Sequence, residues 1–288
     1  MILVVGATGN LGGAVAHSLL APGKSVRILA RPSSNYQPLV AAGAQAMFGD
    51  LKDRASLDPI CKDIDVVITT ANSALRGGED NPETVDWQGN RNLIDAAKIA
   101  RVKQFIFISA NTADPNSPVP FLAAKGKAEE YLQASGIPYT IIAPNAFMEV
   151  WPAMVVGMPA MQGKPVYVAG TGSHKHSFIS VADVISFIIC SIDNPSAINR
   201  RLLIGGPQPL SFRDAATIYE RVLGHPVTVN SVPIGQPVPG LEPGMQPLVA
   251  SFEAFDSPME MKELTRTFGI QLTPLEQAVR RMITKPSA

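Results

Sequence analysis

Cysteine is scarce in this sequence, with only Cys61 and Cys190 among 288 residues. Two cysteines do not make the disulfide framework of a small secreted domain, and neither has a second cysteine or a histidine at metal-ligand spacing. We therefore expect two buried thiols in a cytoplasmic protein, and we predict no metal site.

Net charge is missing as well, because 24 basic and 24 acidic side chains cancel and charged residues make up only 17% of the chain. Such a chain lacks the positive surface that attracts nucleic acids and anionic membranes, so neither is predicted as a partner. Long hydrophobic runs are also absent. The run "VISFIICSI" is far short of the roughly 20 residues of a membrane span, and "MILVV" is interrupted by Gly6 too early for a signal peptide.

Short apolar runs rich in Val and Ile are present, separated by stretches long enough for helices. They read "ILVV" (2–5), "VRILA" (26–30), "AQAMF" (44–48), "DVVITT" (65–70), "QFIFIS" (104–109) and "YTIIA" (139–143). Continuously apolar strands are buried on both faces, which is typical of a parallel sheet between two layers of helices. The predicted fold class is α/β, a doubly wound parallel sheet of the Rossmann type.

A glycine-rich turn follows the first predicted strand and opens a helix. In "ILVVGATGNLGGAV", glycines at 6, 9 and 12 suit a tight turn, a close approach to a pyrophosphate and close helix–sheet packing. The helix N-terminus adds free N–H groups and a partial positive charge. We predict a dinucleotide site that includes Gly6, Ala7, Thr8, Gly9, Asn10, Leu11 and Gly12.

Arg31 stands at the end of the second predicted strand, where an acidic residue would select NAD. A guanidinium fits a 2′-phosphate, whereas it offers no acceptor to a ribose hydroxyl. We therefore predict NADP(H) as the cofactor, with Ser33, Ser34 and Asn35 beside Arg31. The alternative is a solvated surface arginine.

Further cofactor residues are predicted from their positions after the third and fourth strands. Asp50 and Leu51 could flank the adenine, although Asp50 also suits a simple turn. Ala71, Asn72 and Ser73 follow the fourth strand, at the edge of the sheet along which a cofactor lies.

The alternation of apolar runs and helix-length stretches ends after Pro144. Pro, Gly and Met are instead frequent in 144–172 and 233–247. We predict an NADP-binding Rossmann domain at 1–150, completed by roughly 177–206. A smaller C-terminal substrate-binding lobe would comprise 151–176 and 207–288. Capping signatures such as Ser211 with Asp214 indicate that this lobe is folded.

Several motifs together resemble the atypical short-chain dehydrogenase/reductases of the NmrA-like group, which has isoflavone-reductase-like and quinone-reductase-like members. They are "VVGATGNLGG", "FIFISAN", "KGKAEEYLQASGIPYTIIAPNAFME", "FISVADV" and "FGIQLTPLEQAV". The resemblance implies that Lys125 contacts the nicotinamide ribose. It also implies cofactor contacts from the segment after the sixth strand, namely Asn145, Ala146, Phe147 and Met148. Ser109 ends the fifth strand and matches the Ser of the family's familiar Ser, Tyr and Lys set; we predict a cofactor contact for it, with a simple turn former as the alternative.

Phe121 departs from the pattern of the family, whose familiar members keep a Tyr four residues before the Lys. Without that hydroxyl, ketone reduction lacks its proton donor, a contribution of about 10²- to 10⁴-fold in rate. A quinone, enone or aromatic acceptor leaves a weakly basic product and tolerates the change. Lys125 is thus the predicted catalytic residue and Phe121 a predicted substrate contact; a surface role for Lys125 is the alternative.

An aromatic and methionine-rich segment after the sixth strand predicts further contacts with an apolar substrate. We name Phe147, Trp151 and Met154, with an ordinary packed core as the alternative. His174 and His176 lack acidic or Cys partners for a metal. His176 is instead proposed as a substrate contact and a candidate proton donor.

Two functions fit these features. One is an NADPH-dependent reductase of small apolar conjugated substrates. The other is a non-catalytic NADP(H)-binding redox sensor that acts through a regulatory protein partner. The sequence leaves open which applies, and whether the chain forms a homodimer.

Overall fold

The computed structural model describes residues 1–74 and 76–284, and its contacts divide the chain into two compact units. Unit 1 comprises Met1–Ala143 and Ile185–Leu203. Unit 2 comprises Pro144–Val184 and the chain from Ile204 onward. Residues 144–150, 177–184 and 204–206, which the sequence assigned to the Rossmann domain, fall in unit 2 of this division. The last part of the predicted lobe, 285–288, lies outside the described residues.

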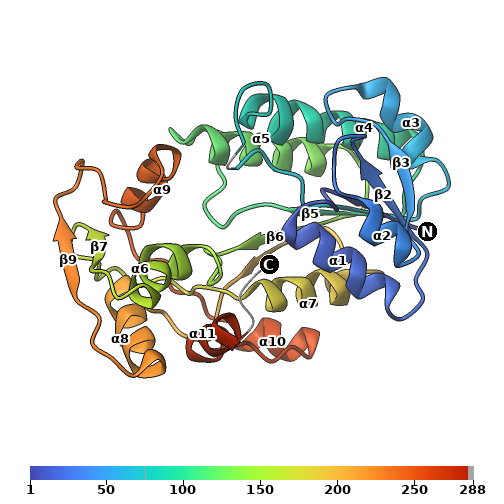
Figure 1. The fold of residues 1–288 in the computed structure, drawn as a ribbon. Helices are drawn as coiled ribbons and strands as arrows, with labels where there is room; N and C mark the ends of the chain where they lie inside the picture. Colours follow the sequence, from blue (N-terminus) through green and yellow to red (C-terminus); the bar gives the residue numbers. More distant parts are fainter. Residues whose placement is uncertain (75, 285–288) are drawn as a thin grey trace. The chain divides into compact units, whose positions relative to one another are not determined.

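Unit 1 is built on a seven-stranded sheet with the order β3-β2-β1-β4-β5-β6-β8 (Figure 1). The five pairings from β3 to β6 are parallel. Every residue of β1, β2, β4 and β5 is buried, as their continuous apolar sequences predicted. The strands are Ile2–Val5 (β1), Val26–Ala30 (β2), Gln45–Phe48 (β3), Val66–Thr69 (β4), Gln104–Ile108 (β5), Tyr139–Pro144 (β6) and Arg200–Ile204 (β8).

Helices cover both faces of this sheet, which confirms the doubly wound fold. Figure 1 shows α3, α4 and α5 on one side and α1 on the other. The order of strands reverses between β1 and β4, and in such sheets ligands bind at the carboxyl edge of this switch point. The helices of unit 1 are Asn10–Leu20 (α1), Gln37–Ala41 (α2), Arg54–Cys61 (α3), Pro82–Gly89 (η1), Asn90–Ile99 (α4) and Pro120–Ala134 (α5), and Val181–Ser191 (α7) runs from unit 2 into unit 1.

The segment η1 is a π-helix that runs directly into α4. A capping box between Asn81 and Thr84 fixes its start, and Pro82 occupies the first turn, where its missing N–H costs no hydrogen bond. The helix packs against α5. A π-turn is wider than an α-turn, so the side chains of η1 do not follow the 3.6-residue period.

Unit 2 has its own core, in which Phe178, Phe212 and Tyr219 are buried. Two short strands, β7 and β9, pair in parallel. The predicted capping box of Ser211 and Asp214 is confirmed at the start of α8. The remaining elements are Ala153–Gly157 (η2), Met158–Met161 (α6), Val166–Ala169 (β7), Phe212–Leu223 (α8), Val229–Val232 (β9), Pro243–Met245 (η3), Gln246–Ser251 (α9), Lys262–Phe268 (α10) and Leu275–Thr284 (α11).

None of the helices formed by residues 1–74 and 76–284 combines the length and hydrophobicity of a bilayer span.

Candidate functional site

The glycine loop between β1 and α1 is closed so tightly that two of its glycines have no substitute. Gly6 has a φ of +82°, a conformation that side chains strain. A Cβ on Gly6 would lie 2.7 Å from Thr70 Oγ1. A Cβ on Gly12 would lie 2.3 Å from the carbonyl oxygen of Gly6. The loop and the helix therefore pack backbone against backbone, as the sequence pattern predicted.

Gly9, in contrast, is not required by packing within the protein. A Cβ there would meet its nearest neighbour at 3.4 Å, an ordinary contact. Gly9 is the N-cap of α1 and has no side chain that could cap the helix. The first turn also contains no acidic residue. The N–H groups of Asn10 and Leu11 therefore stand in the first turn of α1, where no carbonyl oxygen of the helix can accept them. This backbone cradle fits the pyrophosphate of a dinucleotide. Ala7 is buried beside it, and Thr8 is exposed.

Arg31 lies in a cluster of charges that the sequence did not reveal. Its Nη1 donates to Asp80 Oδ2 at 2.7 Å, Lys52 Nζ donates to Asp80 Oδ1 at 2.9 Å, and Arg76 Nη1 donates to Oδ2 at 3.2 Å. The hydrogen bonds from Lys52 and Arg31 hold the pKa of the Asp80 carboxyl well below its usual range. We call Arg31, Lys52, Arg76 and Asp80 the Asp80 cluster. Its members come from three segments, so no local pattern marks it.

The three residues predicted beside Arg31 form a surface turn. The hydroxyl and the N–H of Ser34 both donate to the carbonyl oxygen of Arg31, at 2.7 and 2.9 Å. Ser33 and Asn35 are exposed. The turn positions the chain directly after β2, and the cofactor role of its side chains stays a prediction.

Asp50 and Leu51 follow β3. Asp50 Oδ1 accepts the N–H of Lys52 at 2.9 Å, which is the turn arrangement that the sequence offered as the alternative. Leu51 is buried, and its carbonyl oxygen accepts from Asn92 at 2.9 Å. These contacts fix the backbone that carries Lys52 into the Asp80 cluster.

Ala71, Asn72 and Ser73 follow β4 and bind mainly to their own surroundings. Asn72 Oδ1 accepts the N–H of Ala74 at 3.0 Å and forms a local turn. The N–H of Ser73 donates to Asp86 Oδ2 at 2.9 Å. The carbonyl oxygen of Ala71 accepts from Lys125. The backbone of this loop therefore helps to build the surroundings of Lys125.

Lys125 is buried, with a side chain only 3% exposed, so its alternative role as a surface charge does not apply. Its Nζ lies 3.3 Å from Asp86 Oδ1 and donates to the carbonyl oxygens of Ala71 and Ile108, at 3.3 and 3.1 Å. The ammonium group thus donates two hydrogen bonds to backbone carbonyl oxygens and forms an ion pair with Asp86. The rings of Phe107 and Phe121 lie 4.9 and 5.7 Å from Nζ, within cation–π range.

Asp86 is the residue of this site that sequence reasoning missed. It is completely buried, with Oδ2 bound to the N–H of Ser73. Among the buried polar side-chain atoms of residues 1–74 and 76–284, its Oδ1 alone lacks a hydrogen bond, and its partner is the Lys125 ion pair. The signal in the sequence was an acidic residue between Val85 and Trp87, in a helix of unpredicted pitch.

The hydroxyl of Ser109 is bound to another side chain of the protein. Its hydroxyl donates to Glu129 Oε1, and Glu129 in turn pairs with Arg201 at 2.6 Å. Ser109 is 7% exposed. In this arrangement its hydroxyl stabilises a buried ion pair between α5 and β8. A contact with the cofactor stays a prediction.

The residues predicted from the segment after β6 belong to unit 2. The side chain of Asn145 donates to the carbonyl oxygen of Ser257 at 2.9 Å. Met148 is buried in the core of the unit, while Ala146, Trp151 and Met154 pack against that core. Phe147 is partly buried and pairs by its backbone with Ile179. For Trp151 and Met154 these surroundings match the alternative of an ordinary packed core, and Met148 is itself part of that core.

His176 is buried, and both of its ring nitrogens have partners. Nε2 lies 3.0 Å from the carbonyl oxygen of Phe252, so Nε2 carries the proton, and Nδ1 accepts from the Ser257 hydroxyl at 2.7 Å. Burial lowers the pKa of the imidazole. A neutral ring held in this way is not poised to donate a proton, which argues against the proposed donor role.

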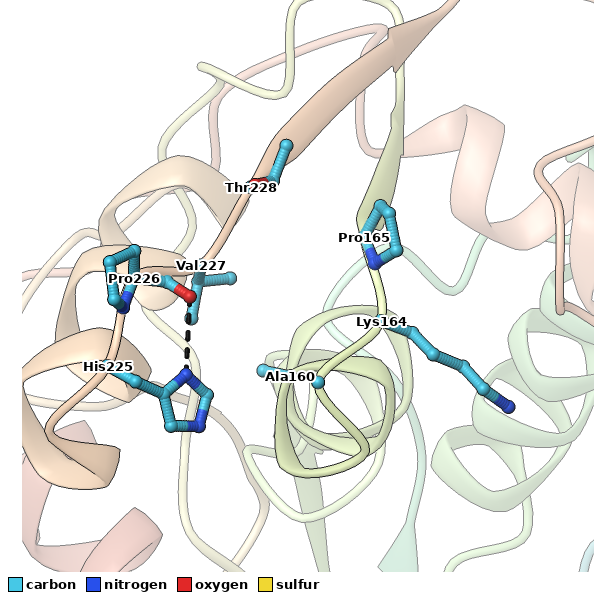
Figure 2. Close-up of a pocket in the computed structure, with 8 residues that line it drawn as sticks. Ala160, Lys164, Pro165, His225, Pro226, Val227 and Thr228 are labelled. Carbon is cyan, nitrogen blue, oxygen red and sulfur yellow. Dashed lines mark hydrogen bonds between the residues drawn. The ribbon is translucent and has the colours of Figure 1, made fainter.

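Two hollows of unit 2 contain none of the predicted site residues. The hollow in Figure 2 has a volume of about 80 Å³ and is lined by residues 160, 163–165 and 225–228. His225 Nδ1 lies 3.2 Å from the carbonyl oxygen of Pro226. Lys164 points away from His225 in this view. The other hollow, of about 350 Å³, is lined in part by the ion pair of Arg221 and Glu276. The first is far smaller than a typical ligand pocket of about 300–1,000 Å³.

Known proteins resemble this chain in sequence and in fold. The "Photosystem II assembly factor Ycf39" of Cyanophora paradoxa is 32% identical over 233 residues, which cover 81% of this chain and 72% of that protein. An "NAD(P)H azoreductase" of Xenophilus azovorans is 28% identical over 236 residues, covering 82% and 78%.

The fold matches a crystal structure of an NADPH-dependent quinone oxidoreductase from Escherichia coli complexed with NADPH. The TM-score is 0.78 at 23% identity, over 98% of this chain and all of that one. The profile of the NmrA-like family matches residues 1–283. The resemblance read from the motifs is therefore confirmed, and the chain belongs to the NmrA-like family.

Proposed function

We propose that this protein binds NADPH on unit 1 and transfers its hydride to a small apolar conjugated acceptor such as a quinone, an enone or an aromatic compound. The observation that carries the proposal is the backbone cradle at Gly6, Gly9 and Gly12, with Arg31 at the end of the neighbouring strand. Gly9 is left without a packing reason of its own, so its lack of a side chain suits a ligand. The names of two similar proteins, an azoreductase and a quinone oxidoreductase, support the same chemistry.

Lys125 has a clear task in such a site. NADPH supplies the hydride, and the acceptor gains negative charge as the hydride arrives. Lys125 is held at the carboxyl ends of β4 and β5 by the carbonyl oxygens of Ala71 and Ile108. A fixed positive charge there stabilises the negative charge that develops. Because Lys125 is buried, paired with Asp86 and bound to two carbonyl oxygens, its role in this proposal is electrostatic stabilisation rather than proton donation.

We expect Arg31→Ala to abolish most of the preference for NADPH over NADH. The guanidinium would lose its bond to the 2′-phosphate, and a hydrogen bond to a charged group contributes about 1.5–3 kcal/mol, or about tenfold or more in Kd. Titration of the wild type and the variant with both cofactors measures the effect. Arg54→Ala is the matched control, because Arg54 is an α3 arginine paired with Asp58. Equal weakening of NADPH and NADH binding would contradict the assignment.

The reductase activity is tested by following NADPH oxidation with a panel of quinones, enones, azo compounds and isolated ketones. We expect turnover with the conjugated acceptors and little with ketones. Lys125→Met combined with Asp86→Asn should lower that turnover, because the double variant removes the positive charge and leaves no unpaired charge in the core. The proposal fails if NADPH binds tightly and no acceptor is reduced.

Phe121→Tyr should raise ketone reduction more than quinone reduction. The substitution adds a hydroxyl one turn before Lys125, and general acid catalysis contributes up to about 10²- to 10⁴-fold for a ketone. A quinone product is weakly basic and gains little from a proton donor. The ratio of kcat/KM values for a ketone and a quinone is the measurement. An equal gain for both substrates would show that the tyrosine acts by packing alone.

A second function is a non-catalytic NADP(H)-binding protein that acts through a protein partner. Two observations favour it. A relative at 32% identity is named as an assembly factor, and the amine of Lys125 is buried and already held by an ion pair and two hydrogen bonds within the protein. The panel assay above separates the two functions, because the partner-binding protein would bind NADPH without reducing any acceptor.

A further inference from the structure

The Asp80 cluster brings together charges from three separate segments at the carboxyl edge of the unit 1 sheet. Arg31 follows β2, Lys52 follows β3, and Arg76 and Asp80 lie between β4 and η1. Three positive charges face one carboxylate, which leaves an excess of two. Two further carboxylates offset part of this excess. Glu79 lies 3.8 Å from Lys52 and is 97% exposed, and the charge of Asp50, after the hydrogen bond to Asp80, also helps to raise the pKa of Lys52.

Both carboxylate oxygens of Asp80 are occupied by these cations. Oδ2 accepts from Arg31 and Arg76, and Oδ1 accepts from Lys52. The Asp80 side chain is 16% exposed, whereas that of Arg31 is 39% exposed. An anion is therefore already bound where the cations converge, and that anion belongs to the protein itself.

We propose that Arg31, Lys52 and Arg76 together form the subsite for the 2′-phosphate of the cofactor, and that Asp80 fills this subsite until the phosphate displaces it. The inference rests on the proposed NADPH function and names the residues that set its selectivity. A phosphate dianion offers three oxygens, which match the three donors of the cluster, and it carries more negative charge than the single carboxylate that it replaces. Asp80 has to leave because two anions in one subsite repel each other.

The segment that carries Asp80 is tied to the start of η1 by hydrogen bonds. Asn81 Nδ2 donates to the carbonyl oxygen of Gly78 at 3.2 Å, and Thr84 Oγ1 donates to the carbonyl oxygen of Glu79. Gly77 and Gly78 precede Asp80, Gly78 has a φ of +62°, and open space surrounds the Cβ position of both. Asn81, directly after Asp80, is fixed by its capping box with Thr84. Displacement of Asp80 therefore requires its side chain to rotate away from the three cations, while the backbone bonds to Asn81 and Thr84 are kept.

The test is Asp80→Asn, which keeps the shape of the side chain and removes its charge. We expect the Kd values for NADPH and for 2′,5′-ADP to fall about three- to tenfold, because the partly exposed ion pairs no longer compete with the phosphate. NADH has no 2′-phosphate, so its Kd should change by less than about twofold. Titration of the full chain with each ligand at one ionic strength gives the three values.

Two control variants separate displacement from a general change of charge. Asp58→Asn removes one negative charge from a single arginine pair on α3. Glu79→Gln removes one within the cluster, from a carboxylate with a single long contact. We expect both to leave the ratio of NADPH to NADH affinity nearly unchanged.

A weaker affinity of Asp80→Asn for NADPH would overturn the inference, because Asp80 would then order the cations rather than compete for them. Equal gains in Asp80→Asn and Glu79→Gln would also overturn it. If no acceptor is reduced in the turnover assay, the reductase proposal is wrong, but the effect of Asp80→Asn on the Kd values remains a valid test of the subsite.

Discussion

Asp86→Asn is expected to lower the free energy of unfolding by about 3–5 kcal/mol, the usual cost of removing one partner from a buried ion pair. Asp86 is 0% exposed, and Lys125 is 2% exposed. The asparagine keeps a group that can accept the N–H of Ser73, so the loss reports the uncompensated charge of Lys125. Urea denaturation of the wild type and the variant measures the difference.

Asp86→Asn combined with Lys125→Met should recover most of this stability. No buried charge remains in the double variant, and replacing a buried pair by neutral groups is often nearly neutral. The double-mutant cycle therefore gives a large coupling energy. Asp58→Asn, which alters a half-exposed pair on α3, should leave the unfolding curve almost unchanged. A loss below about 1 kcal/mol for Asp86→Asn would mean that Asp86 does not hold the charge of Lys125.

Gly12→Ala is expected to damage both stability and cofactor binding. A helical glycine normally gains about 0.5–1 kcal/mol on substitution by alanine. Here the new Cβ would meet the Gly6 carbonyl oxygen at 2.3 Å and Thr70 Oγ1 at 2.5 Å. The backbone of the glycine loop has to move away, at a cost of about 1–3 kcal/mol. Because that backbone forms the phosphate cradle, we expect NADPH binding to be lost. Urea denaturation and an NADPH titration measure the two effects.

Gly9→Ala is the matched control for this substitution. Its Cβ has room in the protein, with the nearest atom at 3.4 Å, so stability should be retained. If the pyrophosphate approaches Gly9, NADPH binding should still weaken. Normal NADPH binding by both variants would refute the assignment of the cradle, even if Gly12→Ala is unstable.

The central fold could be predicted because its signal is local. Continuous apolar runs such as 2–5 and 105–108 leave no polar face, so they belong to a sheet covered on both sides. The strands β7 and β9 were not predicted. Each has four residues, and they lie in or beside stretches rich in Pro and Gly that suggested irregular structure.

The site was only partly predictable because its electrostatic partners are distant in the sequence. Glu129, four residues after Lys125, suggested an exposed helical pair. In the structure Glu129 pairs with Arg201, 72 positions away, and Lys125 pairs with Asp86. The Asp80 cluster likewise joins residues whose convergence follows from the strand order rather than from spacing. The backbone cradle, in contrast, could be predicted from the spacing of the glycines, because a few consecutive residues determine the geometry of the loop.

Because η1 is a π-helix, it holds more residues per turn than an α-helix, and the direction of its side chains depends on the number of residues between Asn81 and Asn90. A residue of an α-helix turns about 100° from its neighbour. Deleting one residue from Pro82–Gly89 would tighten the helix to the α form, leave α4 in place and swing the acidic side chain by about that angle. Such a deletion would remove the counter-charge of Lys125 while keeping every residue type of the site. A protein of this fold with a shorter segment here would therefore need another way to hold that amine.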